Sequence, residues 1–140
     1  METGNFPVIT VQTRVDASLE ETWKCWITPE DVMAWNHASE DWVCPAATND
    51  LRVGGKFNYR MEAADGSMGF DFEGEYDQLE PLKSIGYFLA DGRKVRISFS
   101  RERDLTVVTE SFDAENENPL EMQRFGWQCI LDNFRKHVEF

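Results

Sequence analysis

The C-terminal stretch from Asn118 to about Glu139 has the pattern of one long α-helix. Asn118 is placed to cap the helix, and Pro119 suits its first turn. The acidic side chain of Glu121 interacts favourably with the positive N-terminal end of the helix dipole. At roughly 100° per residue, its apolar side chains cover about half of the circumference or slightly more. A helix lying flat on a sheet needs a narrower stripe, so we expect a curved sheet that encloses this helix on two sides.

The apolar arc consists of two neighbouring clusters with Ile130 between them: Met122, Phe125, Gly126 and Cys129, then Trp127, Leu131, Phe134 and Val138. Three polar residues also fall within the arc: Gln123, Asn133 and His137. Such groups either bond to backbone or buried water, or orient a ligand in an apolar cavity. Gly126 costs roughly 1 kcal/mol relative to alanine inside a helix. Either another backbone packs closely there, or the missing side chain leaves space.

The preceding segments alternate between apolar and polar residues, as strands with one wet face do. Strands are predicted near residues 8–15, 56–62, 68–77, 81–89, 95–99 and 105–112. Turn signals separate them at residues 54–55, 64–67 and 91–92. Ser18 with Glu21 forms a capping box for a helix, and Thr28-Pro29 opens a second short helix that ends near Trp35. Residues 37–50 show no regular pattern.

This order, one strand, two short helices, further hairpin-joined strands and a long helix, predicts an α+β fold. The expected architecture is a curved antiparallel sheet of about six or seven strands around the C-terminal helix. Residues 1–140 contain no linker or repeat, so we expect one domain.

The charge balance excludes some partners. With 14 basic and 26 acidic residues the net charge is −12, which repels phosphate backbones and anionic lipid. We therefore expect neither nucleic acid nor a membrane surface as partner. Three widely spaced cysteines form no disulfide framework, and no signal-peptide pattern or membrane-length apolar run is present. A cytoplasmic location is the corresponding expectation.

Motifs for catalysis or cofactor binding are scarce. The sequence contains no GxGxxG, P-loop, HExxH or GxSxG pattern. Two histidines do not make a multi-histidine metal site, so no metal, cofactor or catalytic residue is predicted. His37 and Cys44 lie close in sequence and could pair as a nucleophile or bind metal with Glu40 and Asp41. The signal is weak, and chance proximity is the favoured explanation.

Aromatic residues face the same side of the predicted sheet: Tyr59, Phe70, Phe72 and Tyr87. Core packing is their default role, but their number and the two hydroxyls also fit an apolar pocket with a few polar contacts.

Several motifs together resemble the activator of Hsp90 ATPase homologue 1-like family, within the START-like helix-grip superfamily. They are Ala17-Ser18-x3-Thr22-Trp23-x2-Trp26-x-Thr28-Pro29-Glu30, Trp35, Asp50-x-Arg52-x-Gly54-Gly55-x-Phe57, Gly69-Phe70-x-Phe72-x-Gly74-x-Tyr76, Pro81 and Gly126-Trp127-x2-Ile130-Leu131-x-Asn133-Phe134. The resemblance implies a helix-grip fold and a cavity for hydrophobic or amphipathic ligands. It implies no single activity.

The leading hypothesis is a protein that binds an apolar, aromatic or amphipathic small molecule between the sheet and the C-terminal helix. Its predicted ligand-binding residues are Trp35, Tyr59, Met61, Phe70, Phe72, Tyr87, Ile97, Phe99, Met122, Gln123, Gly126, Ile130 and Asn133. One alternative is a cyclase- or hydrolase-type enzyme using the same cavity, for which the available groups are Tyr59, Tyr87, Gln123 and His137. Another is an Hsp90-type chaperone partner in a stress response. A second copy of the chain is a further candidate partner.

Overall fold

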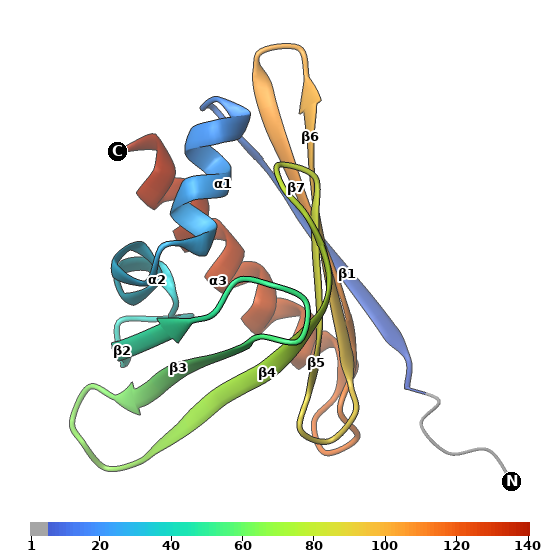
Figure 1. Cartoon of the computed structure of the whole chain (residues 1–140). Coiled ribbons are helices and arrows are strands. Elements are labelled where there is room, and N and C mark those ends of the chain that lie inside the picture. The colour runs from blue at the N-terminus through green and yellow to red at the C-terminus, as the bar shows by residue number, and fades with distance from the viewer. Residues whose placement is uncertain (1–5) are drawn as a thin grey trace, which may run out of the picture.

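The computed structural model describes residues 6–140 and shows three helices and seven strands (Figure 1). In chain order they are β1 (Val8–Val15), α1 (Leu19–Ile27), α2 (Pro29–Trp35), β2 (Trp42–Asn49), β3 (Lys56–Ala63), β4 (Gly69–Glu80), β5 (Ser84–Leu89), β6 (Lys94–Glu102), β7 (Leu105–Asp113) and α3 (Leu120–Glu139).

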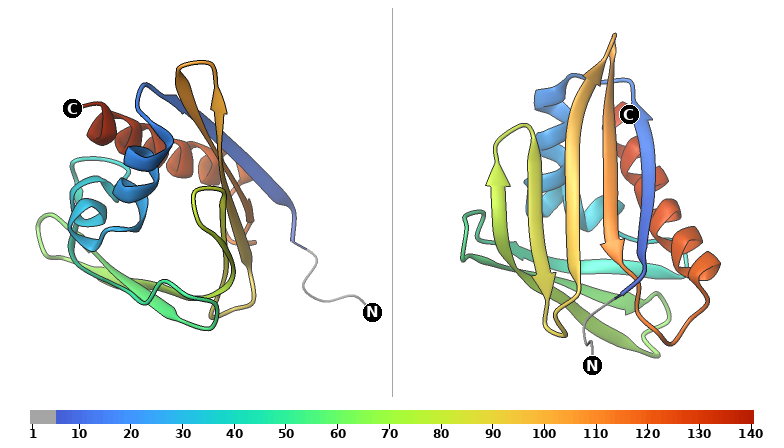
Figure 2. Two further views of the ribbon diagram at one scale, coloured as in Figure 1. Left: turned by 45° about the horizontal axis from the view of Figure 1, so that its top comes forward. Right: turned by 90° about the vertical axis from the view of Figure 1, so that its right-hand side faces the viewer.

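The strands form one antiparallel sheet in the order β1-β7-β6-β5-β4-β3-β2. Apart from β1, neighbours in the sheet are neighbours in sequence, because hairpins join them. The sheet curls so that β2, β3 and β4 turn beneath the helices while β1, β7 and β6 stand beside them (Figure 2). All three helices lie on the concave side, where α3 packs against β1 and α2 against β2. This is the helix-grip fold, and the expected curved sheet around the C-terminal helix is confirmed.

Local signals explain where several elements begin. Ser18 Oγ accepts a hydrogen bond from the Glu21 amide at 3.1 Å and so caps α1 as predicted. Pro29 occupies the first turn of α2, where its missing N–H costs nothing. In β1, every second residue from Ile9 to Val15 is buried, which confirms the predicted alternation.

Three boundaries differ from the sequence expectations. Residues 37–50 contain an edge strand, β2, whose pattern is interrupted by Pro45 and by a register shift between Val43 and Ala46. Strand β5 begins at Ser84 rather than at Pro81, after a turn. Helix α3 begins at Leu120, and Asn118 does not cap it: its side chain donates to Glu115 Oε2 at 2.6 Å instead.

Aromatic contacts join the helices to the sheet. Phe134 of α3 is fully buried against Trp26 and Trp35, at ring-centre distances of 4.9 and 5.0 Å. Trp127 of α3 stacks on Phe112 of β7 at 3.8 Å. These contacts fix α3 along the concave face. Across residues 6–140, none of the helices has the length and apolarity that crossing a bilayer demands.

Candidate ligand-binding site

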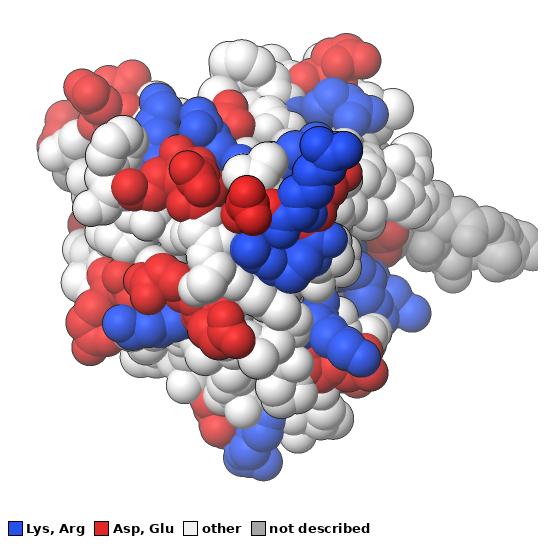
Figure 3. Space-filling view, turned by 90° about the horizontal axis from the view of Figure 1, so that it is seen from above, with Lys and Arg blue, Asp and Glu red and all other residues white. Residues whose placement is uncertain are grey.

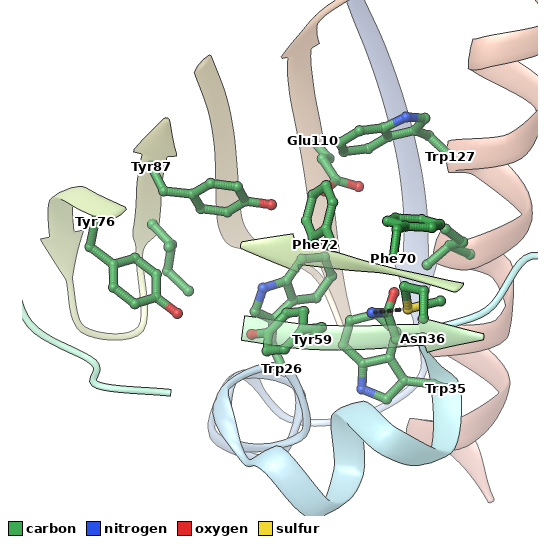
Figure 4. A pocket seen from close by; sticks show the side chains of 13 residues that line it. Trp26, Trp35, Asn36, Tyr59, Phe70, Phe72, Tyr76, Tyr87, Glu110 and Trp127 are labelled. Carbon is green, nitrogen blue, oxygen red and sulfur yellow. Dashed lines mark hydrogen bonds between the residues drawn. The ribbon is translucent and has the colours of Figure 1, made fainter. Parts of the chain in front are cut away.

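A pocket of about 210 Å³ lies between the concave face of the sheet and the helices (Figure 4). Most of its wall is aromatic. The lining residues are Trp26, Trp35, Asn36, Tyr59, Met61, Phe70, Phe72, Tyr76, Ile85, Tyr87, Glu110, Trp127 and Ile130.

Strand register places the sheet side of this wall. Tyr59 of β3 is paired with Phe72 of β4, and Met61 of β3 is paired with Phe70 of β4. Residues paired directly across an antiparallel ladder point to the same face, so these four side chains form one surface. Phe72 also lies 6.5 Å from Tyr87 and 6.2 Å from Trp127, measured between ring centres. Rings from β4, β5 and α3 therefore meet around one space.

Glu110 is the one carboxyl group on the wall. Strand β7 alternates, so Glu110 faces the same side as the buried Val108 and Phe112. Its neighbours across the ladders are Val11 of β1 and Ile97 of β6, both apolar and buried. Only 6% of Glu110 is exposed, and its carboxyl group points into the pocket (Figure 4). The carboxyl group of Glu110 therefore lies among apolar side chains.

This enclosure changes the acidity of Glu110. Burial removes water from the charged form and raises the pKa of Glu110 from 4.5 to about 8. Among residues 6–140, no hydrogen bond or ion pair to its carboxyl group offsets this effect. At neutral pH the empty pocket therefore holds Glu110 mainly as the neutral acid.

The other polar groups of the wall remain uncharged at neutral pH or have partners in the fold. Burial raises the pKa of Tyr59 and of Tyr87 well above the ordinary value, and the Glu110 charge raises that of Tyr87 further. Tyr76 donates its hydroxyl to Asn49 Oδ1 at 2.6 Å. The Trp35 indole N–H donates to the Cys25 carbonyl at 2.9 Å. Within residues 6–140, Glu110 is thus distinguished as an acid of the wall whose carboxyl group has no hydrogen-bond or ion-pair partner.

Seven residues predicted from sequence lie on the pocket wall: Trp35, Tyr59, Met61, Phe70, Phe72, Tyr87 and Ile130. Their contact with a ligand stays a prediction. Phe70 is half exposed, which places it where the pocket meets solvent.

Six predicted residues lie outside the wall. Ile97 and Phe99 are core residues, and Phe99 packs edge-on against Trp23 with ring centres 5.2 Å apart. Met122 is 58% exposed, and a Cβ added to Gly126 would meet nothing within 4 Å. Close backbone packing therefore does not explain Gly126.

Gln123 and Asn133, the other two, satisfy groups of the fold. The Gln123 amide accepts from the Glu115 N–H at 3.0 Å and donates to the carbonyls of Glu115 and Asn118. The Asn133 amide donates to the His37 carbonyl at 2.7 Å. Two roles were expected for these residues, and both Gln123 and Asn133 have the first one, hydrogen bonding to backbone groups.

Six further residues line the wall without having been predicted from sequence: Trp26, Asn36, Tyr76, Ile85, Glu110 and Trp127. Glu110 is the most important omission, because the sequence offered only Tyr59, Tyr87, His137 and Gln123 as polar groups for a reaction in the pocket. Its signal was the alternation of Val108, Glu110 and Phe112, which puts an acid on an apolar face. His137 instead lies 2.9 Å from Asp31, away from the pocket wall.

A second polar cluster joins the three helices. Ligand-type atoms of Cys25, Asp31 and His137 lie within 4.8 Å of one another, a group that could approach one metal ion. The Cys25 thiol, however, donates to Glu21 at 3.7 Å, and burial together with Asp31 and Glu21 raises its pKa to about 11. The thiol is thus protonated, and the hydrogen bond of the cluster that joins two helices is the one between His137 of α3 and Asp31 of α2. Within residues 6–140, the pair His37 and Cys44 forms no such group.

Acidic and basic side chains are interspersed on the face shown in Figure 3. Basic side chains gather near the centre of this view, with acidic side chains next to them.

Comparison with known proteins identifies the family. Residues 16–139 match the family described as activator of Hsp90 ATPase homolog 1-like protein, and the chain belongs to it. Among solved structures, the AHSA1-like protein from Aeromonas hydrophila is 39% identical with a TM-score of 0.89, over 95% of this chain and 92% of that one. Chr148 from Cytophaga hutchinsonii is 50% identical with a TM-score of 0.83, over 94% and 91%.

The fold extends to more distant proteins. The Aha1 dimer from Colwellia psychrerythraea is 17% identical with a TM-score of 0.73, over 96% of this chain and 97% of that one. At this identity the match shows the fold alone. A search of curated proteins gives no match.

Proposed function

We propose that this protein binds a small, mainly apolar molecule in the pocket between the sheet and α3. The observation that carries the proposal is an enclosed aromatic wall with a single unpartnered carboxyl group, Glu110. Ligand sites are typically concave, mostly apolar and supplied with a few polar groups that fix orientation. The pocket volume of about 210 Å³ lies below the range of drug-sized sites, so a compound of one or two rings suits it better than a long lipid.

The wall itself provides the assay. Trp26, Trp35 and Trp127 line the pocket, so a bound molecule changes their fluorescence. We expect a screen of aromatic and aliphatic metabolites to give saturable fluorescence changes, together with an increase in melting temperature, because a ligand that binds only the folded state stabilises it.

Two tryptophan substitutions on α3 provide a matched pair. Ile130→Trp adds bulk at the pocket wall, whereas Phe125→Trp adds an indole where Phe125 is 71% exposed. Ligand binding should be lost in the first and kept in the second. Equal binding by both variants, or a screen with no saturable ligand, would contradict the proposal.

A catalytic use of the same pocket is the second candidate, and Glu110 is the observation that favours it. A general acid or base acts best when its pKa is close to the working pH, and the pKa of Glu110 is about 8. The test is turnover of the ligands found in the screen, comparing the wild type with Glu110→Gln. Unchanged ligand after prolonged incubation would leave binding as the function.

The family name supports a third candidate, association with an Hsp90-type chaperone. It predicts co-elution with Hsp90 and a change in its ATPase rate. The name of the Colwellia psychrerythraea Aha1 dimer similarly suggests that this chain pairs with a second copy, which light scattering after gel filtration tests.

A further inference from the structure

We propose that the natural ligand of this pocket is an aromatic or apolar amine, bound as an ammonium ion by Glu110. This inference rests on the proposed function, because it names the chemical class of the ligand for the same pocket.

Within residues 6–140, the carboxyl group of Glu110 has no partner in the fold. Only 6% of the surface of Glu110 is exposed, and its carboxyl group points into the pocket (Figure 4). A buried carboxylate is expensive unless a positive or hydrogen-bonding group accompanies it. None of the lining residues is Lys, Arg or His, so the wall supplies no cation. A positive partner for the carboxylate form would therefore have to come with the ligand.

Aromatic rings surround this carboxyl group. Trp127 stacks on Phe112, two residues along β7 from Glu110. Phe72 lies between Trp127 and Tyr87, with ring centres 6.2 and 6.5 Å away. Aromatic faces attract cations within about 6 Å, with Trp the strongest. The same rings accept the hydrocarbon part of an amine, so one wall suits both ends of such a ligand.

The charge of the whole chain also favours a cationic ligand. A net charge of −12 raises the local concentration of cations and disfavours anionic ligands. A neutral ligand gains nothing from this field. An organic carboxylate would be repelled by the negative field of the protein. On entering the pocket it would also lie next to the carboxyl group of Glu110.

Ligand binding has a defined proton balance. The amine arrives as an ammonium ion, and Glu110 in the empty pocket is mainly protonated below about pH 8. Formation of the ion pair requires the carboxylate, so one proton leaves Glu110 for solvent for each amine bound. Other titratable groups facing this space are Tyr59 of β3, Tyr76 of β4 and Tyr87 of β5, and each has a raised pKa. The neighbouring side chains from β1, β6 and α3 are Val11, Ile97 and Trp127, which do not titrate.

The direction of the pH effect follows from this balance. Affinity for an amine should rise by up to about tenfold for each pH unit between roughly pH 6 and pH 8, and then level off. A neutral ligand that accepts a hydrogen bond from protonated Glu110 would show the opposite trend, with affinity falling above about pH 8.

Three matched probes separate these cases by titration calorimetry: 2-phenylethylamine, 2-phenylethanol and 3-phenylpropanoate. We expect the amine to bind most tightly near pH 8 and to release close to one proton at pH 6.5. Glu110→Gln should weaken amine binding by about 10- to 100-fold and leave alcohol binding nearly unchanged. The matched control is Glu73→Gln, the same substitution on the exposed outer face of β4.

The outcomes separate the inference from the proposed function. Tighter binding of the alcohol, or amine affinity that falls as pH rises, overturns the amine assignment while a ligand pocket stands. If neither these probes nor any screened compound binds, both proposals fail. Should Glu110→Gln not fold, the pH slope and proton release of the wild type still decide between the two trends.

Discussion

Replacing Glu110 by glutamine should change how the stability of this protein depends on pH. Glutamine keeps the size and shape of the side chain but cannot ionise. In the folded protein the pKa of Glu110 is about 8, whereas in the unfolded chain it returns to about 4.5. The folded state therefore holds a proton that the unfolded state has lost between these two pH values.

The sign of the effect is fixed by this difference. Because the unfolded state binds fewer protons, the free energy of unfolding of the wild type falls as pH rises from about 4.5 to about 8. Full ionisation of Glu110 corresponds to a penalty on the order of 5 kcal/mol, of which about 3 kcal/mol develops between roughly pH 5 and pH 8. Glu110→Gln removes this component, so its advantage over the wild type should grow by about 3 kcal/mol across that interval.

Urea unfolding followed by tryptophan fluorescence measures this quantity at each pH. Comparing the two proteins at matched pH cancels the contributions of other titrating groups, and Glu73→Gln controls for the loss of one negative charge. A difference between Glu110→Gln and the wild type that stays constant from about pH 5 to about pH 8 would refute the reasoning, because Glu110 would then titrate alike in both states.

Three further substitutions test the description of the fold. Gly126→Ala should raise the free energy of unfolding by about 0.5–1 kcal/mol, since no atom lies near the added Cβ; a loss of stability would reveal a hidden contact. Gln123→Ala should cost about 1–3 kcal/mol by leaving Glu115 and Asn118 backbone groups unpaired, and a neutral result in urea unfolding would show that water replaces these bonds. Tyr76→Phe should cost about 1 kcal/mol in the same assay by removing the bond to Asn49; an unchanged value would deny that bond a structural role.

The sequence predicted those parts of the fold that depend on local periodicity. The alternation of β1, the capping of α1 by Ser18 and the length of α3 all follow from spacing within one segment. Strand β2 was not predicted, because its regular pairing is interrupted after Val43 and because Pro45 breaks the alternating pattern that indicates a strand.

The pocket was harder to predict because its residues come from segments far apart in sequence. Periodicity gives directions around the α3 axis but not how far along that axis the sheet extends. Met122 and Phe125, in the first turns of α3, therefore have apolar spacing yet are exposed. Glu110 reaches the wall only because the curled sheet brings β7 opposite β3 and β4, an arrangement that no single segment encodes.

The most direct test of the ligand pocket is the titration of the Glu110 side-chain carbon by carbon-13 NMR, in the free protein and with the tightest ligand from the screen. Our account predicts a pKa of about 8 without ligand and a clear displacement of that value when the pocket is filled. A value near 4.5 in the free protein, or one that the bound ligand does not move, would contradict it.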